Sequence, residues 1–464
     1  MTKLYLSIVA FILATTIHAQ NSSSSEYYYY YKNQKVYLTV DKSKVNIITS
    51  SNFQKVSISN LGFQDFNLEN INGSVTKKIG KLESTTTLTD AQFLQKLNSL
   101  KQKPNIKNVG LYFKTGETTK SIGTSNIFYV KLNNASDYTA TQKGVQIERQ
   151  IPNMPQWYVI SVDNASIGTA LKMSNEFYET GLFADIDPAF MFDFYSEYVE
   201  NEDQETVNTP PPSTSSPTPC ATDPLFVLNW TLNNTLFNNG IEVHACGAWT
   251  ISKGEGTKIA LIDSGVQKDH PDLANNIYTD NSYDCLTQTS PSVIWSKHGT
   301  EVAGMAAAVR NNDYPIVGIA PESKLMVVSH KLQAVPGIAA ELADGIAWAW
   351  QNGADVINCS WGAVVGNFGD PGAQNLVSAV LEEAILDAMT LGRDGKGSVV
   401  VFAAGNTRRI TYPAKFHEDI LTVGSIRYTG QQSYMEGYYI TYPNDPQTYY
   451  YYQSAYGDEL DVVA

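Results

Sequence analysis

Two different spacings of apolar residues divide the chain into two parts. From about residue 224 onward, short apolar runs typical of buried strands alternate with longer stretches in which apolar residues recur at helical intervals. The expected strands are residues 257–263, 324–329, 354–362, 397–406 and 419–425, and the expected helices are residues 298–309, 339–353 and 375–392. Such alternation predicts an α/β domain in which helices cover a sheet of mostly parallel strands.

The first part, about residues 26–200, has mixed patterning and predicts an α+β fold. Residues 35–40 alternate as a strand does, and Thr89 with Gln92 forms a capping box in front of a helix. Further along, the pattern predicts a strand, a helix and another strand at residues 157–162, 175–181 and 182–186.

Two unusual segments of the first part are interpreted as structural and not as functional sites. The five tyrosines at residues 27–31 are interpreted as a strand that packs against the domain. Gly123-Thr124-Ser125 lies between two expected strands and is interpreted as an ordinary turn. The sequence of this part contains no glycine-rich phosphate loop, metal-ligand cluster or nucleophile motif.

The ends of the first part carry processing and linker signals. Residues 1–19 place a lysine ahead of an apolar run of about a dozen residues and end on Ala19, which is the layout of a cleavable secretory signal. A membrane anchor would need about 20 apolar residues. We therefore expect a secreted protein in which residues 201–223, polar and rich in proline, link a domain at 20–200 to one at 224–464.

The net charge limits which partners are expected, and the cysteine spacing limits which metal sites and disulfides are expected. The net charge of −14 argues against nucleic acid or an anionic membrane as a partner. The four cysteines fit no zinc-binding spacing and allow three disulfide connectivities, which sequence alone does not separate. Proximity favours the pair Cys220 and Cys246 over pairings that involve Cys285 or Cys359.

Three polar residues stand where apolar strands of the second part end, each beside a glycine. Asp263, Ser360 and Asn406 occupy these positions. Because ligand sites of parallel sheets gather at the carboxyl ends of the strands, we expect these side chains to share one edge. The adjacent glycines let a ligand approach the backbone closely.

His298 gives this group a chemical interpretation. A histidine at a helix start is electrostatically unusual, because the helix dipole disfavours the imidazolium there. A carboxylate such as Asp263 that accepts from one ring nitrogen leaves the other free to take a proton, which is how a general base activates a hydroxyl nucleophile. Asn406, next to Gly405, can offer an amide donor to a developing oxyanion.

The segments ALIDSG, HGTEVAG, SWG and VVVFAAGN, in this order, resemble those of the subtilisin-like serine peptidases over nearly all of residues 224–464. The resemblance implies a doubly wound fold and secreted endopeptidase activity on protein or peptide substrates, with no cofactor in the chemistry. Asp263 would orient His298, and Asn406 would stabilise the oxyanion. Substrate would bind along Ser360, Trp361, Gly362 and Gly405.

The sequence departs from the family pattern at the nucleophile. The family's serine follows a Gly-Thr-Ser-Met-type segment, and no such segment is found before Ala464. We expect the sequence to lack its C-terminal end and the printed polypeptide to be inactive. The alternative is a secreted pseudoenzyme that binds peptides without hydrolysis, through backbone pairing along Ser360–Gly362.

By the same resemblance, the first part would be a propeptide that blocks the cleft with its tail. Residues 182–194 match that tail in position, and cleavage in the linker would release the enzyme. The alternative is an independent binding domain. The resemblance also implies calcium held by side chains and loop carbonyls, an oxygen set that suits this ion, from Asp272, Asn312, Arg310, Tyr314 and Ile316. Pro315 replaces a glycine that is usual in that loop.

Overall fold

The structure is a computed structural model of the chain. It describes residues 27–53, 58, 61–63, 68–71, 77–115, 121–134, 143–196, 220–234, 237, 240–363, 376–406, 409–442 and 445–464. The expected signal peptide and residues 201–219 of the expected linker lie outside these ranges. Residues 220–223 pack against the second part, where Ala221 and Asp223 are buried. The packed second body therefore begins before residue 224.

The second body is built on a seven-stranded sheet in which all neighbouring strands run parallel. The strand order is β14-β15-β13-β16-β18-β19-β22. The strands are β13 (Lys258–Asp263), β14 (Ile277–Asp284), β15 (Lys324–Ser329), β16 (Val356–Cys359), β18 (Val399–Ala403), β19 (Leu421–Gly424) and β22 (Val462–Val463). The expected parallel sheet is confirmed, and β14 and β22 add strands that the apolar pattern did not predict.

Helices cover both faces of this sheet, as a doubly wound fold requires. They are α3 (Ala245–Ala248), α4 (His298–Ala307), α5 (Ile338–Gln351) and α6 (Ala379–Gly395), with short 3-10 turns at Phe226–Leu228 and Ala274–Asn276. Along β13, Ala260 and Ile262 pack in the cluster of α5 and α6, whereas Leu261 packs in the cluster of α4. Because side chains alternate along a strand, one apolar run supplies both cores.

The first body contains two antiparallel sheets and a hairpin, in agreement with the expected α+β fold. One sheet has the order β4-β5-β3-β6-β7, the other has the order β11-β8-β10-β9, and β1 pairs with β2. The strands are β1 (Tyr27–Tyr31), β2 (Gln34–Leu38), β3 (Val40–Ser50), β4 (Leu68–Asn70), β5 (Lys77–Glu83), β6 (Ile106–Lys114), β7 (Ser121–Gly123), β8 (Ile127–Lys131), β9 (Val145–Ile151), β10 (Met154–Val162) and β11 (Asp185–Asp187).

Two helices pack on these sheets, α1 (Asp90–Lys101) and α2 (Ala170–Glu179). The predicted capping box at α1 is present: Thr89 Oγ1 accepts from the Gln92 backbone, and the Gln92 side chain accepts from the Thr89 backbone. The tyrosine strand is confirmed as β1.

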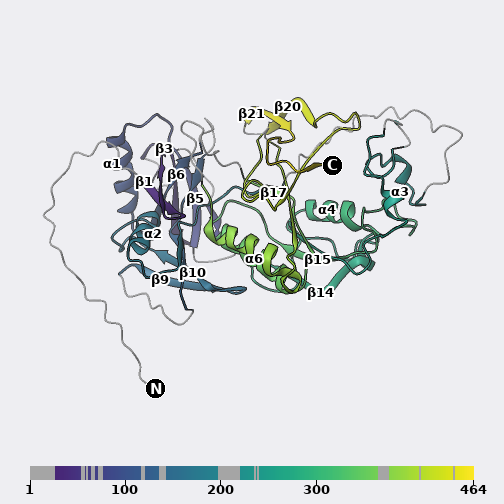
Figure 1. Cartoon of the computed structure of the whole chain (residues 1–464). Helices are drawn as coiled ribbons and strands as arrows, with labels where there is room; N and C mark the ends of the chain where they lie inside the picture. The colour runs from purple at the N-terminus through teal and green to yellow at the C-terminus, as the bar shows by residue number, and fades with distance from the viewer. Residues whose placement is uncertain are drawn as a thin grey trace, which may run out of the picture.

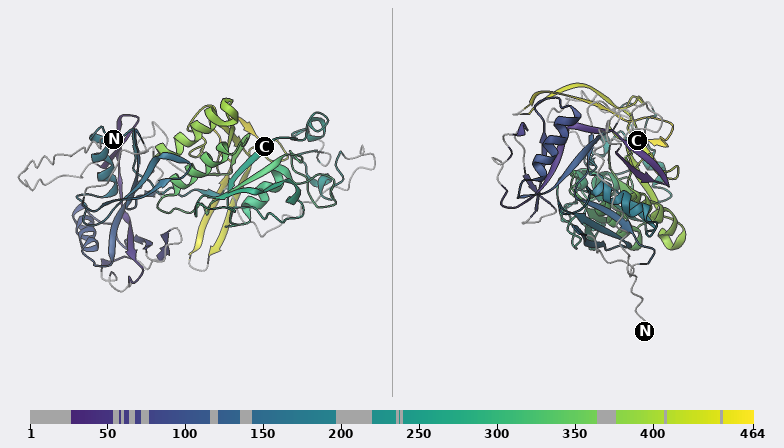
Figure 2. Two further views of the ribbon diagram at one scale, coloured as in Figure 1. Left: turned by 90° about the horizontal axis from the view of Figure 1, so that it is seen from below. Right: turned by 90° about the vertical axis from the view of Figure 1, so that its left-hand side faces the viewer.

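The two bodies meet at the helices that cover one face of the parallel sheet. Figure 1 shows the first body (purple to blue) beside α6, which belongs to the second body (teal to yellow). Strand β11 contacts α6 and strand β9 contacts α5. Figure 2 shows the hairpin of β20 (Tyr434–Tyr442) and β21 (Asp445–Gln453) in yellow, extending away from the parallel sheet.

Among the residues that the structure describes, no helix has the length and apolar character needed to cross a bilayer.

Candidate active site

The candidate site forms at the carboxyl end of β13, where the strand order reverses. The chain continues from β13 toward β15 on one side and later returns to β16 on the other, so the edge beside Asp263 is the switch point of the sheet. Crevices at such points are the usual ligand sites of open α/β sheets. The fold therefore positions Asp263 where the sequence pattern predicted.

Close backbone packing brings His298 to Asp263. Gly265, with φ of 91°, turns the chain after β13, and Gly299 in the first turn of α4 lies against it. A Cβ on Gly299 would come within 2.3 Å of the Gly265 carbonyl oxygen, so a larger residue would push α4 away. This contact explains the glycine after His298.

The Asp263 carboxylate and the His298 imidazole form a buried pair. His298 Nδ1 lies 2.8 Å from Asp263 Oδ1, and the side chains are 9% and 1% exposed, respectively. Asp263 Oδ1 also accepts from the backbone N–H and the hydroxyl of Ser264, at 2.6 and 3.0 Å. The Ser264 hydroxyl in turn accepts from Gly299 N at 3.0 Å, which ties the carboxylate loop to α4.

This geometry determines how the imidazole can act. An ionised carboxylate only accepts hydrogen bonds, so Nδ1 carries the proton that faces Asp263, and Nε2 of the neutral ring is the basic nitrogen. The other carboxylate oxygen, Asp263 Oδ2, is buried without a hydrogen-bond partner. The hydrogen bonds of this carboxylate are therefore all made through Oδ1, to the His298 ring and to Ser264.

The strand expected to bind substrate is occupied by the first body. Strand β17 (Trp361–Gly362) pairs antiparallel with β12 (Tyr195–Ser196), with Tyr195 opposite Gly362 and Ser196 opposite Trp361. Ser360 precedes β17, and its hydroxyl accepts from Asn358 Nδ2 at 2.9 Å. The predicted substrate strand thus presents its backbone to an extended segment of the same chain.

Trp361 anchors this strand to the end of β13 that carries Asp263. Its indole is fully buried, and Nε1 donates to the Ile262 carbonyl at 2.8 Å, one residue before Asp263. The ring of Phe194, from the segment that leads into β12, packs edge-on against Trp361 with centroids 5.0 Å apart. The indole therefore forms an apolar surface on which an aromatic side chain already rests.

Asn406 and Gly405 follow β18, at the same edge of the sheet. Gly405 has φ of 112°, and a Cβ there would come within 2.5 Å of Thr411 Cγ2. Strand β16 separates β18 from β13, so Asn406 is not a direct neighbour of Asp263 along the sheet. Its role toward an oxyanion remains a prediction.

Of the residues predicted to bind calcium, Asn312 and Ile316 each contact Asp272. Asp272 is buried, its Oδ1 accepts from Asn312 Nδ2 at 3.0 Å, and its Oδ2 accepts from Ile316 N at 3.3 Å. Asn312 Oδ1 accepts from Tyr314 N at 3.1 Å. The Arg310 guanidinium lies over the Trp249 ring and donates to the Cys220 carbonyl.

These side chains could bind an ion that prefers oxygen ligands only if backbone carbonyls supplied further ligands. Among the described residues, no group of three or more His, Cys, Asp or Glu side chains could hold a metal. A calcium ion at Asp272 would therefore need the Asn312 amide oxygen and loop carbonyls as most of its ligands.

None of the four cysteines is suited to act as a nucleophile. Cys220 and Cys246 form a disulfide with Cα atoms 5.7 Å apart, which confirms the pairing favoured by proximity. Cys285 and Cys359 are buried thiols, and burial raises the pKa of each well above its usual range. Neither thiol supplies a thiolate at neutral pH.

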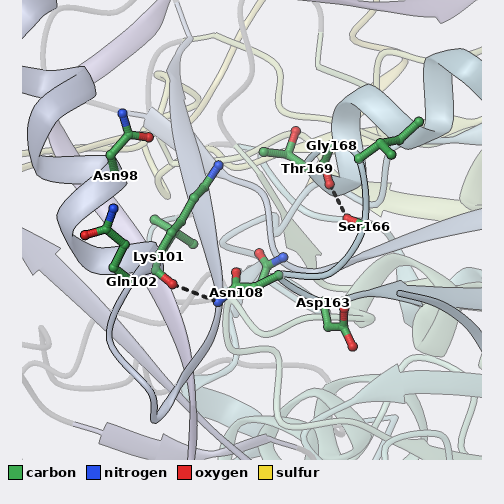
Figure 3. Close-up of a pocket in the computed structure, with 11 residues that line it drawn as sticks. Asn98, Lys101, Gln102, Asn108, Asp163, Ser166, Gly168 and Thr169 are labelled. Carbon is green, nitrogen blue, oxygen red and sulfur yellow. Dashed lines mark hydrogen bonds between the residues drawn. The ribbon is translucent and has the colours of Figure 1, made fainter. Parts of the chain in front are cut away.

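One cavity of about 340 Å³ lies elsewhere, in the first body. Figure 3 shows Asn98 and Lys101 from α1 on one side and Ser166, Gly168 and Thr169 on the other. It contains neither Asp263 nor His298.

Sequence reasoning missed the residues that support the pair. Ser264 holds both Asp263 and α4, and the signal for it was its place between an aspartate and a glycine after a strand. It also missed Asp223, whose carboxylate accepts from Asn311 N at 2.9 Å and so fixes the loop that carries Asn312.

The doubly wound sheet and the Asp–His pair at its switch point define a subtilisin-like α/β protein. The sequence model of the subtilase family matches residues 254–464. Thermitase from Thermoactinomyces vulgaris is 35% identical over 225 residues, which cover 48% of this chain and 67% of thermitase. The chain therefore belongs to the subtilase family.

Two further comparisons cover less of the relatives. A calcium-dependent protease from Nostoc sp. is 36% identical over 191 residues, 39% of this chain and 28% of that protease. The solved structure of fervidolysin from Fervidobacterium pennivorans, a keratinolytic enzyme related to subtilisin, has 21% identity and a TM-score of 0.48, covering 73% of this chain and 53% of that one. The chain thus spans only part of each relative's length.

Proposed function

We propose that the chain is the acid–base part of a secreted serine endopeptidase. The observation that carries the proposal is the buried 2.8 Å contact between Asp263 Oδ1 and His298 Nδ1 at the switch point of the sheet. The proposal covers the acid, the base and the oxyanion donor, because no serine of the 464 residues is assigned as the nucleophile. Export is supported by the disulfide, since such bonds persist in oxidising compartments.

The reaction would proceed by acyl transfer. His298 Nε2 takes the proton of the serine hydroxyl while the serine oxygen attacks the peptide carbonyl carbon, and the Asn406 amide donates to the oxyanion that forms. His298 then gives its proton to the leaving amine, and a water molecule releases the acyl group by the same steps. Asp263 stabilises the imidazolium and stays ionised throughout.

Labelling with a fluorophosphonate probe tests this proposal. We expect no labelling of the 464-residue polypeptide and clear labelling of a longer protein that also contains a serine segment of the family type, called the serine-bearing protein below. His298→Ala in the longer protein should abolish labelling, because no base activates the serine. A longer protein that is folded but neither labels nor cleaves peptides would contradict the proposal.

We also infer that the first body is the inhibitory propeptide of this site. The inference is supported by the pairing of β12 with β17, which occupies the backbone groups that an extended substrate would use. Cleavage of residues 201–219 by an added protease with an engineered recognition site should raise peptidase activity in the serine-bearing protein. Unchanged activity after complete cleavage and separation would favour an independent binding domain.

The alternative function is peptide binding without hydrolysis. It is favoured by one observation: the β12–β17 pairing uses backbone groups alone and needs no catalytic residue. A serine-bearing protein that binds extended peptides, and does so equally well with His298→Ala, without any turnover, would support this alternative.

A structural calcium ion is a further part of the proposal. It is supported by the contact between the buried Asp272 and Asn312, and by the similarity to a protease named as calcium-dependent. The ion would join the 272 and 310–316 loops, and it would take no part in bond cleavage.

A further inference from the structure

The contact between the two bodies buries a carboxyl group that forms no ion pair among the described residues. Glu382 lies in the first turn of α6 and is 4% exposed. Its Oε2 accepts from the Tyr31 hydroxyl of β1 at 2.8 Å, whereas its Oε1 is buried with no hydrogen-bond partner. An ionised carboxylate in this position would leave a buried charged oxygen unsolvated.

A second carboxyl group from the first body lies against the same helix end. Asp187 of β11 is fully buried, and its Oδ2 accepts from the Ser378 hydroxyl at 2.6 Å and from Val380 N at 3.2 Å. Its Oδ1 accepts from Ala189 N at 2.8 Å. Asp187 therefore caps α6 across the interface between the bodies.

The charged and titratable groups around this pair are mostly acidic or neutral. Asp185 adds a negative charge near both carboxyls, and Lys32 is the cation that faces Glu382. Lys131 is engaged by Glu383 at 2.7 Å. The other titrating neighbours are tyrosines of β1, β8 and the loop after β18: Tyr29, Tyr31, Tyr129 and Tyr412.

The acid at the neighbouring helix is arranged differently. Glu341 in the first turn of α5 is equally buried, but its Oε2 lies 2.9 Å from His330 Nε2. Because His330 Nδ1 accepts from Leu332 N, Nε2 carries the proton that faces Glu341. Arg149 of β9 also approaches Glu341 Oε1, at 3.8 Å. Of the two glutamates, Glu382 is therefore the one that forms no ion pair within the described part of the chain.

We propose that Glu382 and Asp187 form a proton-dependent latch that holds the first body on α6 in mildly acidic solution and weakens as the pH rises. The latch regulates the site of the proposed endopeptidase, and its consequence for activity rests on that function. Its existence rests only on the interface described above.

The direction of the pH dependence follows from the pKa values of the two carboxyls, which are higher when the bodies are docked than when they are separated. Burial, with smaller contributions from Asp187 and Asp185, raises the pKa of Glu382 to about 8 against the bond from Tyr31 and the charge of Lys32. Burial raises the pKa of Asp187 to about 6. Separated bodies would expose both carboxyls, which then titrate near their ordinary values of about 4. The docked state thus binds more protons, and this contribution to docking is lost as the pH rises from about 4 to about 8.

Hydrogen exchange on the intact chain can measure this latch at a single amide. Val380 is among the first residues of α6, so its N–H has no acceptor within the helix, and the Asp187 carboxylate of the docked body is its partner. After correction for intrinsic exchange, we expect its protection to fall by up to tenfold per pH unit for each carboxyl that titrates, which means both carboxyls between about pH 5 and 6 and mainly Glu382 from there to about pH 8. The Ala404 amide, bonded to the Val423 carbonyl inside the second body, should show no such trend.

Two variants at adjacent positions separate the latch from general weakening. Glu382→Gln cannot ionise, so protection of Val380 should lose most of its dependence on pH above 6. Glu383→Gln is the matched control, because Glu383 is about one quarter exposed and paired with Lys131, and its variant should keep the wild-type slope. If Glu382→Gln fails to fold, exposed Lys32→Gln replaces it. That variant should match wild type at pH 5 and exchange faster at pH 8.

Several results would overturn the proposal. Protection of Val380 that stays constant from pH 5 to 9 in the wild type would do so. A Glu382→Gln variant whose Val380 protection depends on pH as steeply as in the wild type would also overturn it. So would equal exchange rates of the Val380 amide in wild type and Lys32→Gln at pH 8. No step of this experiment uses peptide hydrolysis, so a chain that never cleaves a peptide would leave the latch standing.

Discussion

Individual residues carry the catalytic proposal, and the sequence predicted the most constrained of them. Asp263 and His298 were identifiable because Asp263 ends an apolar strand two residues before Gly265 and His298 begins a helix directly before Gly299. Their partner Ser264 was not, since a serine after an aspartate is common in turns and its two bonds depend on α4 folding back. Side chains that act through a distant segment leave little trace in local sequence.

The Asp263 carboxylate should be needed for the correct tautomer of His298. In Asp263→Asn the amide can donate to Nδ1, which moves the ring proton to Nε2 and removes the base. In the serine-bearing protein we expect kcat for a peptide substrate to fall by about 10⁴-fold, the loss known for the same change in a Ser-His-Asp triad. KM should change little.

Exposed Asp269→Asn, close by in the sequence, serves as the control for this experiment and should retain full turnover. An Asp263→Asn enzyme with turnover within tenfold of wild type would show that the carboxylate does not hold the tautomer.

At the scale of elements, apolar spacing predicted the strands that are buried on both faces. Strands β13, β15, β16, β18 and β19 all have continuous apolar runs and were expected. Strand β14 was not, because its sequence YTDNSYD is largely polar. Strand β12 was not either, since a two-residue strand exists only through its partner β17.

The capping box of α1 should contribute measurably to the stability of the first body. Thr89→Ala removes the hydroxyl that accepts from Gln92 N and is expected to lower the free energy of unfolding by about 1 kcal/mol. Urea denaturation followed by circular dichroism measures the change. Gln95→Ala, on the exposed face of the same helix, should stay within about 0.5 kcal/mol of wild type. Equal effects of both substitutions would contradict the role of the cap.

At the scale of the whole molecule, the division into two bodies was predictable and their docking was not. A proline-rich stretch between two different apolar patterns indicated two domains. Asp187 and Glu382, which are buried where the bodies meet, look like ordinary surface acids in the sequence. Their environment is created by β1 and β11 packing on α6, a contact between segments far apart in the chain.

Calcium is expected to act at this largest scale, because its proposed ligands join loops on either side of α4. Binding at 100 times Kd would stabilise the folded chain by about 2.7 kcal/mol. For a domain of 150–250 residues, each kcal/mol corresponds to about 2–4 °C in Tm. Chelation should therefore lower the Tm of the second body by several degrees, as measured by calorimetry.

Two aspartate variants serve as the test and its control. Asp272→Ala should lower Tm and remove the response to chelator, whereas exposed Asp269→Ala should keep the wild-type Tm and the response to chelator. A wild-type Tm that does not respond to chelation, after calcium has been supplied in excess, would rule out the ion at this loop.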